Sequence, residues 1–342
     1  MNKKIKFVLI FFICSISCIQ IKNKEINAFA KQTVFILGDS KSCYYPKSQI
    51  PKEGWTQEFV NMLDSKTGLT VQHLETYKKY ANVIRYEFDQ YQIENWSVSG
   101  TSCTTAYKSK LFSTMLDQVK PKDYVIIALQ HNDARNRVGE SVTKYKEYLR
   151  MFAEKIQKKK AKVVFMTTTP KNYLKDKNIK MHSPEYRNIM LKVAKEKNCQ
   201  CIDLAKISTD YFNFRSRNYI NSLYLKLPAG KDPAWKDGVD DNSHYTEKGA
   251  KVVAQMIAVD IQFKHKIKIF KFKKNTNSLF RVYKKACSYK NKRNYTKKSW
   301  KNMIKQRNNA WKVLYTPNST NQQCKTAQHM LINALRKLKK LK

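Results

Sequence analysis

Acidic residues are missing from the C-terminal part of this sequence: from Lys264 to Lys342 there is no aspartate and no glutamate, beside 24 lysines and arginines. Residues 31–263 hold 38 basic and 25 acidic residues, a difference of +13, although the formal net charge of the chain is +41. A segment with many basic residues and no carboxylates attracts polyanions. Acidic polysaccharides, wall phosphate polymers or anionic lipid are therefore its expected partners. The aromatic and basic spacing of nucleic-acid-binding modules is also missing, so no nucleic acid is expected.

Long hydrophobic runs are missing as well, because the one extended apolar stretch, Phe7–Ile19, is too short to span a bilayer comfortably. Basic residues precede it and Ala28-Phe29-Ala30 follows it, as in a secretory signal peptide. We therefore expect residues 1–30 to be a signal peptide, Lys31 to be the mature start, and the protein to be secreted, with cell-surface association left open. No transmembrane helix is expected. Lipidation at Cys18 remains the alternative to cleavage of the signal peptide.

Cysteines at the spacing of a zinc site are also missing, so no metal is expected. Export permits disulfides, and removal of the signal peptide leaves six cysteines: Cys43, Cys103, Cys199, Cys201, Cys287 and Cys324. Cys43 and Cys103 are candidates for a bridge if their two loops line the same cleft. Cys287 and Cys324 fall on two predicted helices, where they either form a disulfide that staples the helices together or remain two buried thiols. The remaining two lie on one predicted strand and are expected to be core thiols.

The sequence does contain a short serine-bearing turn after a buried strand. Val34–Leu37 is an apolar, partly β-branched run that predicts a strand, and Gly38-Asp39-Ser40 ends it with turn-forming residues. In open α/β sheets, ligands and chemistry are found at the exposed carboxyl ends of the strands. On its own this tripeptide is a weak signal, since many strand-ending turns have such a sequence.

A histidine and an aspartate far along the chain supply what a nucleophilic serine needs. An imidazole must take the proton of the hydroxyl, and a carboxylate must orient the imidazole. Asp241 lies three residues before His244, and at a turn that opens a helix we expect their side chains to lie side by side. Two further segments, Ser99-Gly100 and Gln130–Asp133, each follow an apolar stretch and offer amides for an oxyanion hole.

These four segments, in this order, resemble the conserved blocks of the GDSL/SGNH hydrolase family. The triplet His131-Asn132-Asp133 and the stretch His244–Ala250 look most like those of the rhamnogalacturonan acetylesterases and related carbohydrate deacetylases. The resemblance covers residues 33–262.

The resemblance implies a serine esterase that works without a cofactor. Ser40 is then the nucleophile, His244 is first the general base and later the general acid, and Asp241 orients His244. The backbone N–H groups of Ser40 and Gly100 and the side-chain amide of Asn132 are the expected oxyanion donors.

The same resemblance suggests two substrate contacts. His131 occupies a position that it assigns to the cleft wall or to substrate contact, and a hydrogen-bonded structural role is an equal alternative. Trp55 follows the serine block as in the family and is a candidate contact, with a core position as its alternative. Gln130 stands where the family usually has glycine, which puts the local backbone path in question.

Predicted strands and helices alternate along the chain up to residue 263, which indicates an α/β fold. The expected arrangement is the three-layer SGNH type, with a parallel sheet covered by helices on both faces. We expect strands at 34–37, 93–98, 123–129, 161–168 and 200–204, and helices at 56–63, 108–119, 141–158, 186–197 and 249–261. The polar residues 65–90 are interpreted as an insertion of undefined shape. The expected domains are a hydrolase domain at 31–263 and a basic linker at 264–278.

Residues 279–342 predict a C-terminal three-helix bundle from three amphipathic segments. The stretches Tyr295–Trp300 and Trp311–Leu314 resemble the FIVAR module, a small three-helix unit of bacterial surface and glycan-degrading enzymes. FIVAR modules usually contain acidic residues. The absence of acidic residues from this segment suggests an anionic ligand such as an anionic glycan or wall polymer. A solvated, lysine-rich spacer is the alternative.

The resulting hypothesis is a secreted serine esterase that removes O-acetyl groups from a polysaccharide, either a pectin-type or a cell-wall glycan, through an acyl-enzyme. Two alternatives stay open. One is a secreted lipase or broad acyl esterase of the same fold, and the other is a surface adhesin whose basic C-terminal module binds anionic wall polymers.

Overall fold

The computed structural model describes residues 31–64, 69–74, 83–135, 141–173, 178–265 and 267–341. The predicted signal peptide lies outside the described residues, and the compact unit considered below begins at Gln32. None of the helices in the described part is long and apolar enough to cross a membrane.

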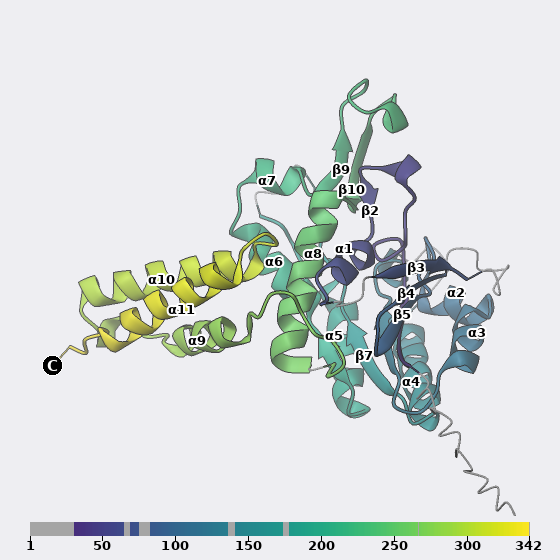
Figure 1. The fold of residues 1–342 in the computed structure, drawn as a ribbon, viewed down its shortest axis with the longest axis horizontal. Helices are drawn as coiled ribbons and strands as arrows, with labels where there is room; N and C mark the ends of the chain where they lie inside the picture. The colour runs from purple at the N-terminus through teal and green to yellow at the C-terminus, as the bar shows by residue number, and fades with distance from the viewer. Residues whose placement is uncertain are drawn as a thin grey trace, which may run out of the picture. The chain divides into compact units, whose positions relative to one another are not determined.

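A seven-stranded sheet forms the centre of this unit (Figure 1). Its strands, in spatial order, are β3 (Thr70–His73), β4 (Ile84–Glu87), β5 (Tyr91–Asn95), β1 (Gln32–Gly38), β6 (Tyr124–Ala128), β7 (Lys162–Met166) and β8 (Gln200–Ile202). The strands from β5 to β8 in this order run parallel. They are the strands that the sequence predicts, so the prediction of an α/β fold with a parallel sheet is confirmed.

The side chains of β1 alternate between the two faces of the sheet, as in any strand. Val34 and Ile36 belong to one hydrophobic cluster, whereas Phe35 and Leu37 belong to another, and all four are buried. Burial on both faces explains why the sequence of this strand is a continuous apolar run.

Helices cover both faces and complete the three layers. The face of Val34 is covered by α1 (Trp55–Asn61), α6 (Leu204–Asn213) and α8 (Glu247–Asp260). The face of Phe35 is covered by α2 (Cys103–Lys108), α3 (Leu111–Gln118), α4 (Val142–Lys158) and α5 (Pro184–Glu196). The helix predicted at 108–119 corresponds to α3, which begins three residues later because Lys110 has a left-handed backbone with φ of 65°, and the preceding α2 was not predicted.

The predicted insertion at 65–90 extends the central sheet at one edge. Strands β3 and β4 pair antiparallel with each other, and β4 pairs antiparallel with β5. Arg85 of β4 and Glu94 of β5 form an ion pair of 2.7 Å across this junction. Residues 65–68 and 75–82 of the insertion lie outside the described residues.

A second, antiparallel sheet was not predicted. It contains β2 (Lys52–Glu53), β10 (Val239–Thr246) and β9 (Tyr224–Leu227), in that order, and α7 (Arg217–Asn221) precedes β9. Strand β10 carries Asp241 and His244, which the sequence analysis placed at a turn opening a helix. That expectation is corrected: the residues lie on a strand, and α8 begins directly after it. The polar composition of β10 hides its strand character, because it lacks alternating apolar residues.

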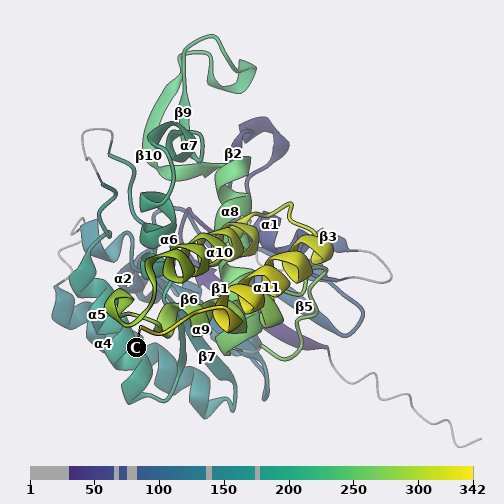
Figure 2. The ribbon, with the colours of Figure 1, turned by 90° about the vertical axis from the view of Figure 1, so that its left-hand side faces the viewer.

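Three C-terminal helices are present as predicted: α9 (Asn277–Ser288), α10 (Lys297–Tyr315) and α11 (Asn321–Arg336). They lie side by side in both views (Figures 1 and 2). Their buried side chains belong to the same hydrophobic cluster as Val34 of the central sheet. Trp311 of α10 contacts Tyr211 of α6 and the following Phe214, with ring centroids 5.0 and 4.8 Å apart. The helices are therefore packed on the α/β part.

The described residues 267–276, between α8 and α9, also pack on the α/β part. Phe270 is buried, and its ring centroid lies 5.4 Å from that of Phe59 and 5.5 Å from that of Tyr91. Leu63 and Phe272 form an antiparallel bridge. Part of the predicted linker thus contributes to the common core, while the domain boundaries themselves stay a prediction.

None of the six cysteines after the predicted cleavage site forms a disulfide with another of them. Cys43 and Cys103 are both buried, and Cys43 Sγ donates to the Ser97 carbonyl at 3.3 Å. Neither the bridge between these two nor the staple between Cys287 and Cys324 is formed.

Glu53 of β2 gives the stability of the fold a pH dependence. Burial, followed by the neighbouring carboxylates of Glu58 and Glu247, raises the pKa of Glu53 from 4.5 to about 7. Between these two pH values the folded protein keeps a proton that the unfolded chain has released. The free energy of unfolding therefore falls as the pH rises through this window.

Replacing this carboxyl by an amide removes the titration. We expect Glu53→Gln to raise the melting temperature by about a few degrees relative to wild type at pH 8, and by less at pH 5. The control is Glu147→Gln, which removes an exposed carboxylate from α4 and leaves Glu53 in place. An equal shift for Glu53→Gln at both pH values, measured by thermal melts, would contradict this account.

Candidate active site

The turn after β1 fixes the backbone around Ser40. The Ser42 N–H donates to the Asp39 carbonyl at 3.0 Å, and the Asp39 side chain accepts from the Lys41 N–H at 2.9 Å. The Tyr45 hydroxyl donates to the Ser40 carbonyl at 2.7 Å. Ser40 itself is 5% exposed. The candidate nucleophile therefore lies in a well-held turn at the carboxyl end of a central strand.

Asp241 and His244 are in contact, as expected. Asp241 Oδ2 lies 2.6 Å from His244 Nδ1, and Asp241 Oδ1 accepts from the N–H groups of Ser243 at 2.6 Å and of His244 at 3.1 Å. Burial acts to raise the pKa of Asp241, but the hydrogen bond from His244 and its charge outweigh burial and hold this pKa well below its usual range. The carboxylate is therefore ionised and orients the imidazole, which keeps its Nε2 for a proton transfer.

An irregularity in β10 makes this contact possible. In a regular strand, residues three apart point to opposite faces of the sheet. The pairing of β10 with β9 shifts register between Asp240 and Tyr245, and Asp241 and His244 lie within that stretch. Bulges of this kind re-aim side chains and are common beside active sites. The irregular pairing explains how the two side chains meet.

The serine turn and this dyad share one electrostatic environment. Burial raises the pKa of Asp39, and the positive charges of Lys41 and of His244 oppose that rise. In the part of the chain that the structure describes, no hydrogen bond joins Ser40 to His244. Catalytic hydrogen bonds are often long in the absence of substrate. The structure thus brings Asp241 and His244 into contact and leaves Ser40 near them.

The expected oxyanion donors Gly100 and Asn132 lie on the loops after β5 and β6. Gly100 has φ of +79°, and a Cβ there would meet nothing within 4 Å, so its backbone conformation is what calls for glycine. Asn132 Nδ2 donates to the Thr101 carbonyl at 3.0 Å, and a primary amide has a second hydrogen to donate. Asp133 accepts from the Cys103 N–H at 2.8 Å. These two contacts tie the loops together.

The neighbours of Asn132 are buried. Gln130, the departure from the family pattern, accepts from the Thr168 N–H at 3.0 Å and so joins the ends of β6 and β7. His131 is 2% exposed, and its ring centroid lies 4.8 Å from that of His182. Burial lowers the pKa of both histidines, to about 4 for His182. Both imidazoles are therefore neutral and pack on each other, and substrate contact by His131 stays a prediction.

Trp55 lies behind the serine turn. Its side chain is 2% exposed and packs edge-to-face on Phe59, with ring centroids 6.0 Å apart. The backbone N–H of Trp55 donates to the Lys41 carbonyl at 2.9 Å. This burial favours the core position that was the alternative to a substrate contact.

The sequence analysis did not single out Lys41, which follows the candidate nucleophile directly. Lys41 is 5% exposed, and its Nζ donates to the carbonyl and the hydroxyl of Thr169 at 3.0 and 2.9 Å. The Thr169 hydroxyl also bonds the hydroxyl of Tyr245, the residue after His244. Lys41 therefore connects the serine turn with the strand of the dyad.

The buried interior of this turn is an unusual environment for a charged lysine side chain. Burial lowers the pKa of Lys41 to about 7, although the charge of Asp39 opposes the shift. The signal available in the sequence was a charged residue next to the serine, where a buried strand ends. Within the described ranges, no three His, Cys, Asp or Glu side chains come together as metal ligands would.

Removal of the Lys41 ammonium is expected to disturb the alignment of the site. We expect Lys41→Met to lower kcat for ester hydrolysis by about 10²-fold with little change in KM, because a small displacement of reacting groups has this effect. Lys144→Met, an exposed substitution on α4, is the matched control. A folded Lys41→Met protein with wild-type kcat would show that the connection through Thr169 is dispensable.

Comparison with known proteins agrees with this geometry. Residues 34–257 match the GDSL-like lipase/acylhydrolase family. The rhamnogalacturonan acetylesterase RhgT of Bacillus subtilis (strain 168) is 24% identical over 230 residues, which are 67% of this chain and 89% of that protein. The probable rhamnogalacturonan acetylesterase YesY of the same organism is 26% identical over 175 residues, 50% of this chain and 76% of that one.

Among solved structures, the crystal structure of the Bacillus subtilis protein YxiM has a similar fold, with a TM-score of 0.53 and 21% identity. The similarity covers 68% of this chain and 56% of that one. The family match spans well over half of the chain and includes Ser40, Asp241 and His244. The protein therefore belongs to the GDSL-like lipase/acylhydrolase family, and it is a carboxylic ester hydrolase.

Proposed function

We propose that this hydrolase is a secreted serine esterase that removes O-acetyl groups from a polysaccharide of the pectin or cell-wall type. The observation that carries the proposal is the Asp241–His244 pair beside the turn of Ser40, in a chain similar to rhamnogalacturonan acetylesterases. The serine turn and this pair provide acyl-transfer chemistry, and the relatives indicate a carbohydrate acetyl ester.

In the first half of the reaction, Ser40 Oγ attacks the acetyl carbonyl and His244 Nε2 takes its proton. Asp241, fixed by two backbone N–H groups, stabilises the imidazolium. Negative charge develops on the carbonyl oxygen. The N–H groups of Ser40 and Gly100 and the second hydrogen of Asn132 Nδ2 stabilise this charge by hydrogen bonds. The imidazolium then gives its proton to the leaving sugar oxygen, and an acetyl group remains on Ser40.

In the second half, a water replaces the sugar. His244 takes a proton from the water, the resulting hydroxide attacks the acetyl-serine, and the same donors hold the oxyanion. Collapse releases acetate and returns the proton to Ser40 Oγ. No step needs a group beyond those of the chain, the ester and water.

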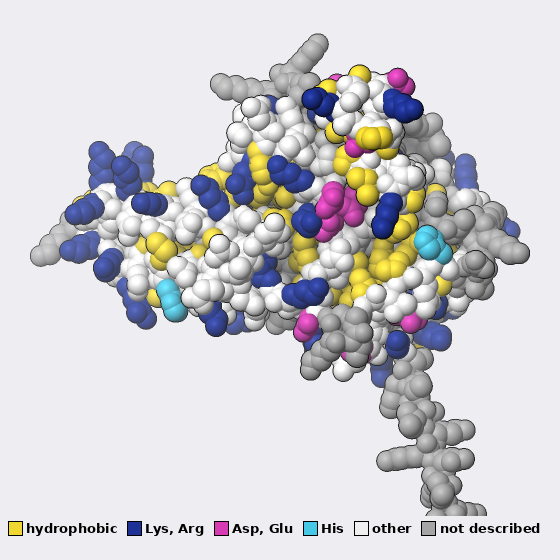
Figure 3. Space-filling model, turned by 45° about the horizontal axis from the view of Figure 1, so that its top comes forward, with side chains coloured by type: hydrophobic (Ala, Val, Ile, Leu, Met, Phe, Trp, Pro, Cys, Tyr) yellow, Lys and Arg dark blue, Asp and Glu magenta, His cyan; other side chains and the backbone are white. Residues whose placement is uncertain are grey.

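The surface of the C-terminal helices suits a polyanionic partner. Figure 3 shows Lys and Arg side chains distributed over the part formed by α9, α10 and α11, without Asp or Glu among them, as the sequence requires. A pectin-type or wall polymer carries the opposite charge, so this surface attracts it. The charge thereby supports an enzyme that works on a polymer.

Asn132 is the donor whose removal is easiest to interpret. We expect Asn132→Ala to lower kcat by 10²- to 10³-fold, on the order of 3 kcal/mol in the barrier, with KM little changed. Thermal melts check that the loss of the bond to Thr101 leaves the protein folded. Asn132→Asp, which keeps the size and adds a negative charge, should be at least as slow. Wild-type kcat in a folded Asn132→Ala protein would exclude the oxyanion role.

The substrate class is tested by acetate release from acetylated pectin, acetylated xylan and acetylated peptidoglycan, with Ser40→Ala as the control. We expect release from one of these polymers and none from the Ser40→Ala protein. Acetate and palmitate esters of nitrophenol are assayed beside them. Activity confined to the long-chain ester would replace the proposal by a lipase, and the absence of all serine-dependent hydrolysis would refute the esterase mechanism.

A further inference from the structure

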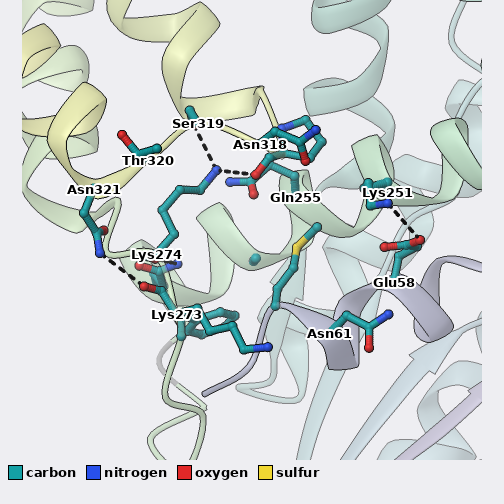
Figure 4. A pocket seen from close by; sticks show the side chains of 15 residues that line it. Glu58, Asn61, Lys251, Gln255, Lys273, Lys274, Asn318, Ser319, Thr320 and Asn321 are labelled. Carbon is teal, nitrogen blue, oxygen red and sulfur yellow. Dashed lines mark hydrogen bonds and ion pairs between the residues drawn. The ribbon is translucent and has the colours of Figure 1, made fainter. Parts of the chain in front are cut away.

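A cavity of about 420 Å³ lies between the α/β part and the C-terminal helices (Figure 4). Its walls come from α1, from α8, from the chain before α9 and from the turn between α10 and α11. Ser40, Asp241 and His244 do not line it. Its volume is that of a small-molecule binding site, so the cavity is a candidate for a second site.

Buried and half-buried hydrogen bonds hold the walls of this cavity together. Lys274 Nζ donates to the carbonyls of Thr316 and Pro317 at 2.9 and 3.2 Å and to Ser319 Oγ at 3.1 Å. Gln255 of α8 is buried, and its Nε2 donates to the Leu314 carbonyl at 2.9 Å. These contacts join α8 and the chain before α9 to the turn after α10. The cavity is therefore built by the fold itself.

Asn321 adds one further connection. Its Nδ2 donates to the Lys273 carbonyl at 3.2 Å, and its Oδ1 accepts from the Asn275 N–H at 2.9 Å. The backbone of Lys273 is held on its other side, because its N–H donates to the Met62 carbonyl at 3.0 Å. The backbone of Lys273 is thus held from both sides, while its side chain is exposed.

The charges in this cavity are not balanced. Among the described residues that line it, Glu58 is the one carboxylate, and it pairs with Lys251 at 3.4 Å. The contacts of Lys274 Nζ are to neutral oxygens, and burial lowers its pKa to about 8. Lys273 Nζ makes no hydrogen bond or ion pair with any described residue, and Figure 4 shows it on the side of Asn61. An anion in the cavity would supply the missing partner.

Apolar side chains occupy other parts of the wall, among them Met62, Phe272 and Pro317. A compact inorganic anion would leave them unused. A sugar ring offers C–H faces to such surfaces and hydroxyl groups to amides, which the cavity presents through Asn61 and Asn318. A ring that also carries a carboxylate would use both the apolar and the cationic parts.

We propose that this cavity is a second, non-catalytic binding site for a carboxylate-bearing sugar residue, with Lys273 as the partner of the carboxylate. The choice of ligand rests on the proposed function, because an acidic polysaccharide would present such residues next to the acetylated ones. The site would hold the polysaccharide on the enzyme while an ester bond of the same polysaccharide is cleaved at the active site.

The test is calorimetric titration of trigalacturonate, which carries no acetyl group, into the full-length protein at low salt. Lys273→Ala is expected to raise Kd about tenfold, the loss of one hydrogen bond to a charged group. Lys301→Ala is the matched control, because it also removes one exposed lysine but from α10, outside the cavity. It should change Kd less than twofold. Both variants should hydrolyse a nitrophenyl acetate at the wild-type rate.

Neutral xylotriose and inorganic phosphate complete the design. Absence of trigalacturonate binding, equal weakening by both substitutions, equal binding of xylotriose, or displacement by an equal concentration of phosphate would each overturn the proposal. Since trigalacturonate binding needs no hydrolysis, the result of the titration does not depend on the result of the esterase assay. An enzyme inactive on every acetyl ester would refute the proposed function and leave the titration as a direct measure of this site.

Discussion

The candidate active site depends on the pairing of β1 with β5 on one side and with β6 on the other. Because the three strands are parallel, the loops that follow them meet at one edge of the sheet, and these loops carry Ser40, Gly100 and Asn132. The turn after β1 is closely packed: a Cβ on Gly38 would lie 2.1 Å from Ser42 Oγ and 2.8 Å from Ser97 Oγ. A larger residue at Gly38 would thus push apart the first two loops. The geometry of the site is therefore a consequence of strand pairing and of close packing below the serine.

What the sequence could predict follows from how local each feature is. Strands β1, β6 and β7 were predictable because each contains a continuous apolar run. The contact between Asp241 and His244 was predictable because the two residues are close in sequence. The irregular pairing of β10 with β9 that lets them meet was not predictable, since β10 has no apolar alternation. The role of Lys41 was hidden for a different reason: its partner Thr169 lies 128 residues away. Only the folded structure shows which buried polar group a distant lysine will meet.

Two ionisable side chains, Asp39 and Lys41, are buried on either side of the candidate nucleophile. Burial shifts both pKa values toward the neutral forms, and each charge opposes the shift of the other. Such a pair contributes little net stability, because the loss of hydration offsets the attraction. Apolar residues would fill this space at a lower free-energy cost. Local conflicts of this kind are expected at functional sites, where orientation of a reacting group matters more than stability.

Helix α8 connects this site to the C-terminal helices. It begins directly after β10, with the Thr246 hydroxyl accepting from the Gly249 N–H at 3.3 Å, and further along Gln255 bonds the last turn of α10. A flexible tether would let a bound polymer sample many distances from the candidate catalytic residues, which lowers its effective concentration there. One continuous helix that holds His244 near its start and the basic helices on its flank fixes that distance. The basic helices packed on α8 therefore keep a fixed distance from His244, which a flexible spacer of the same charge would not do.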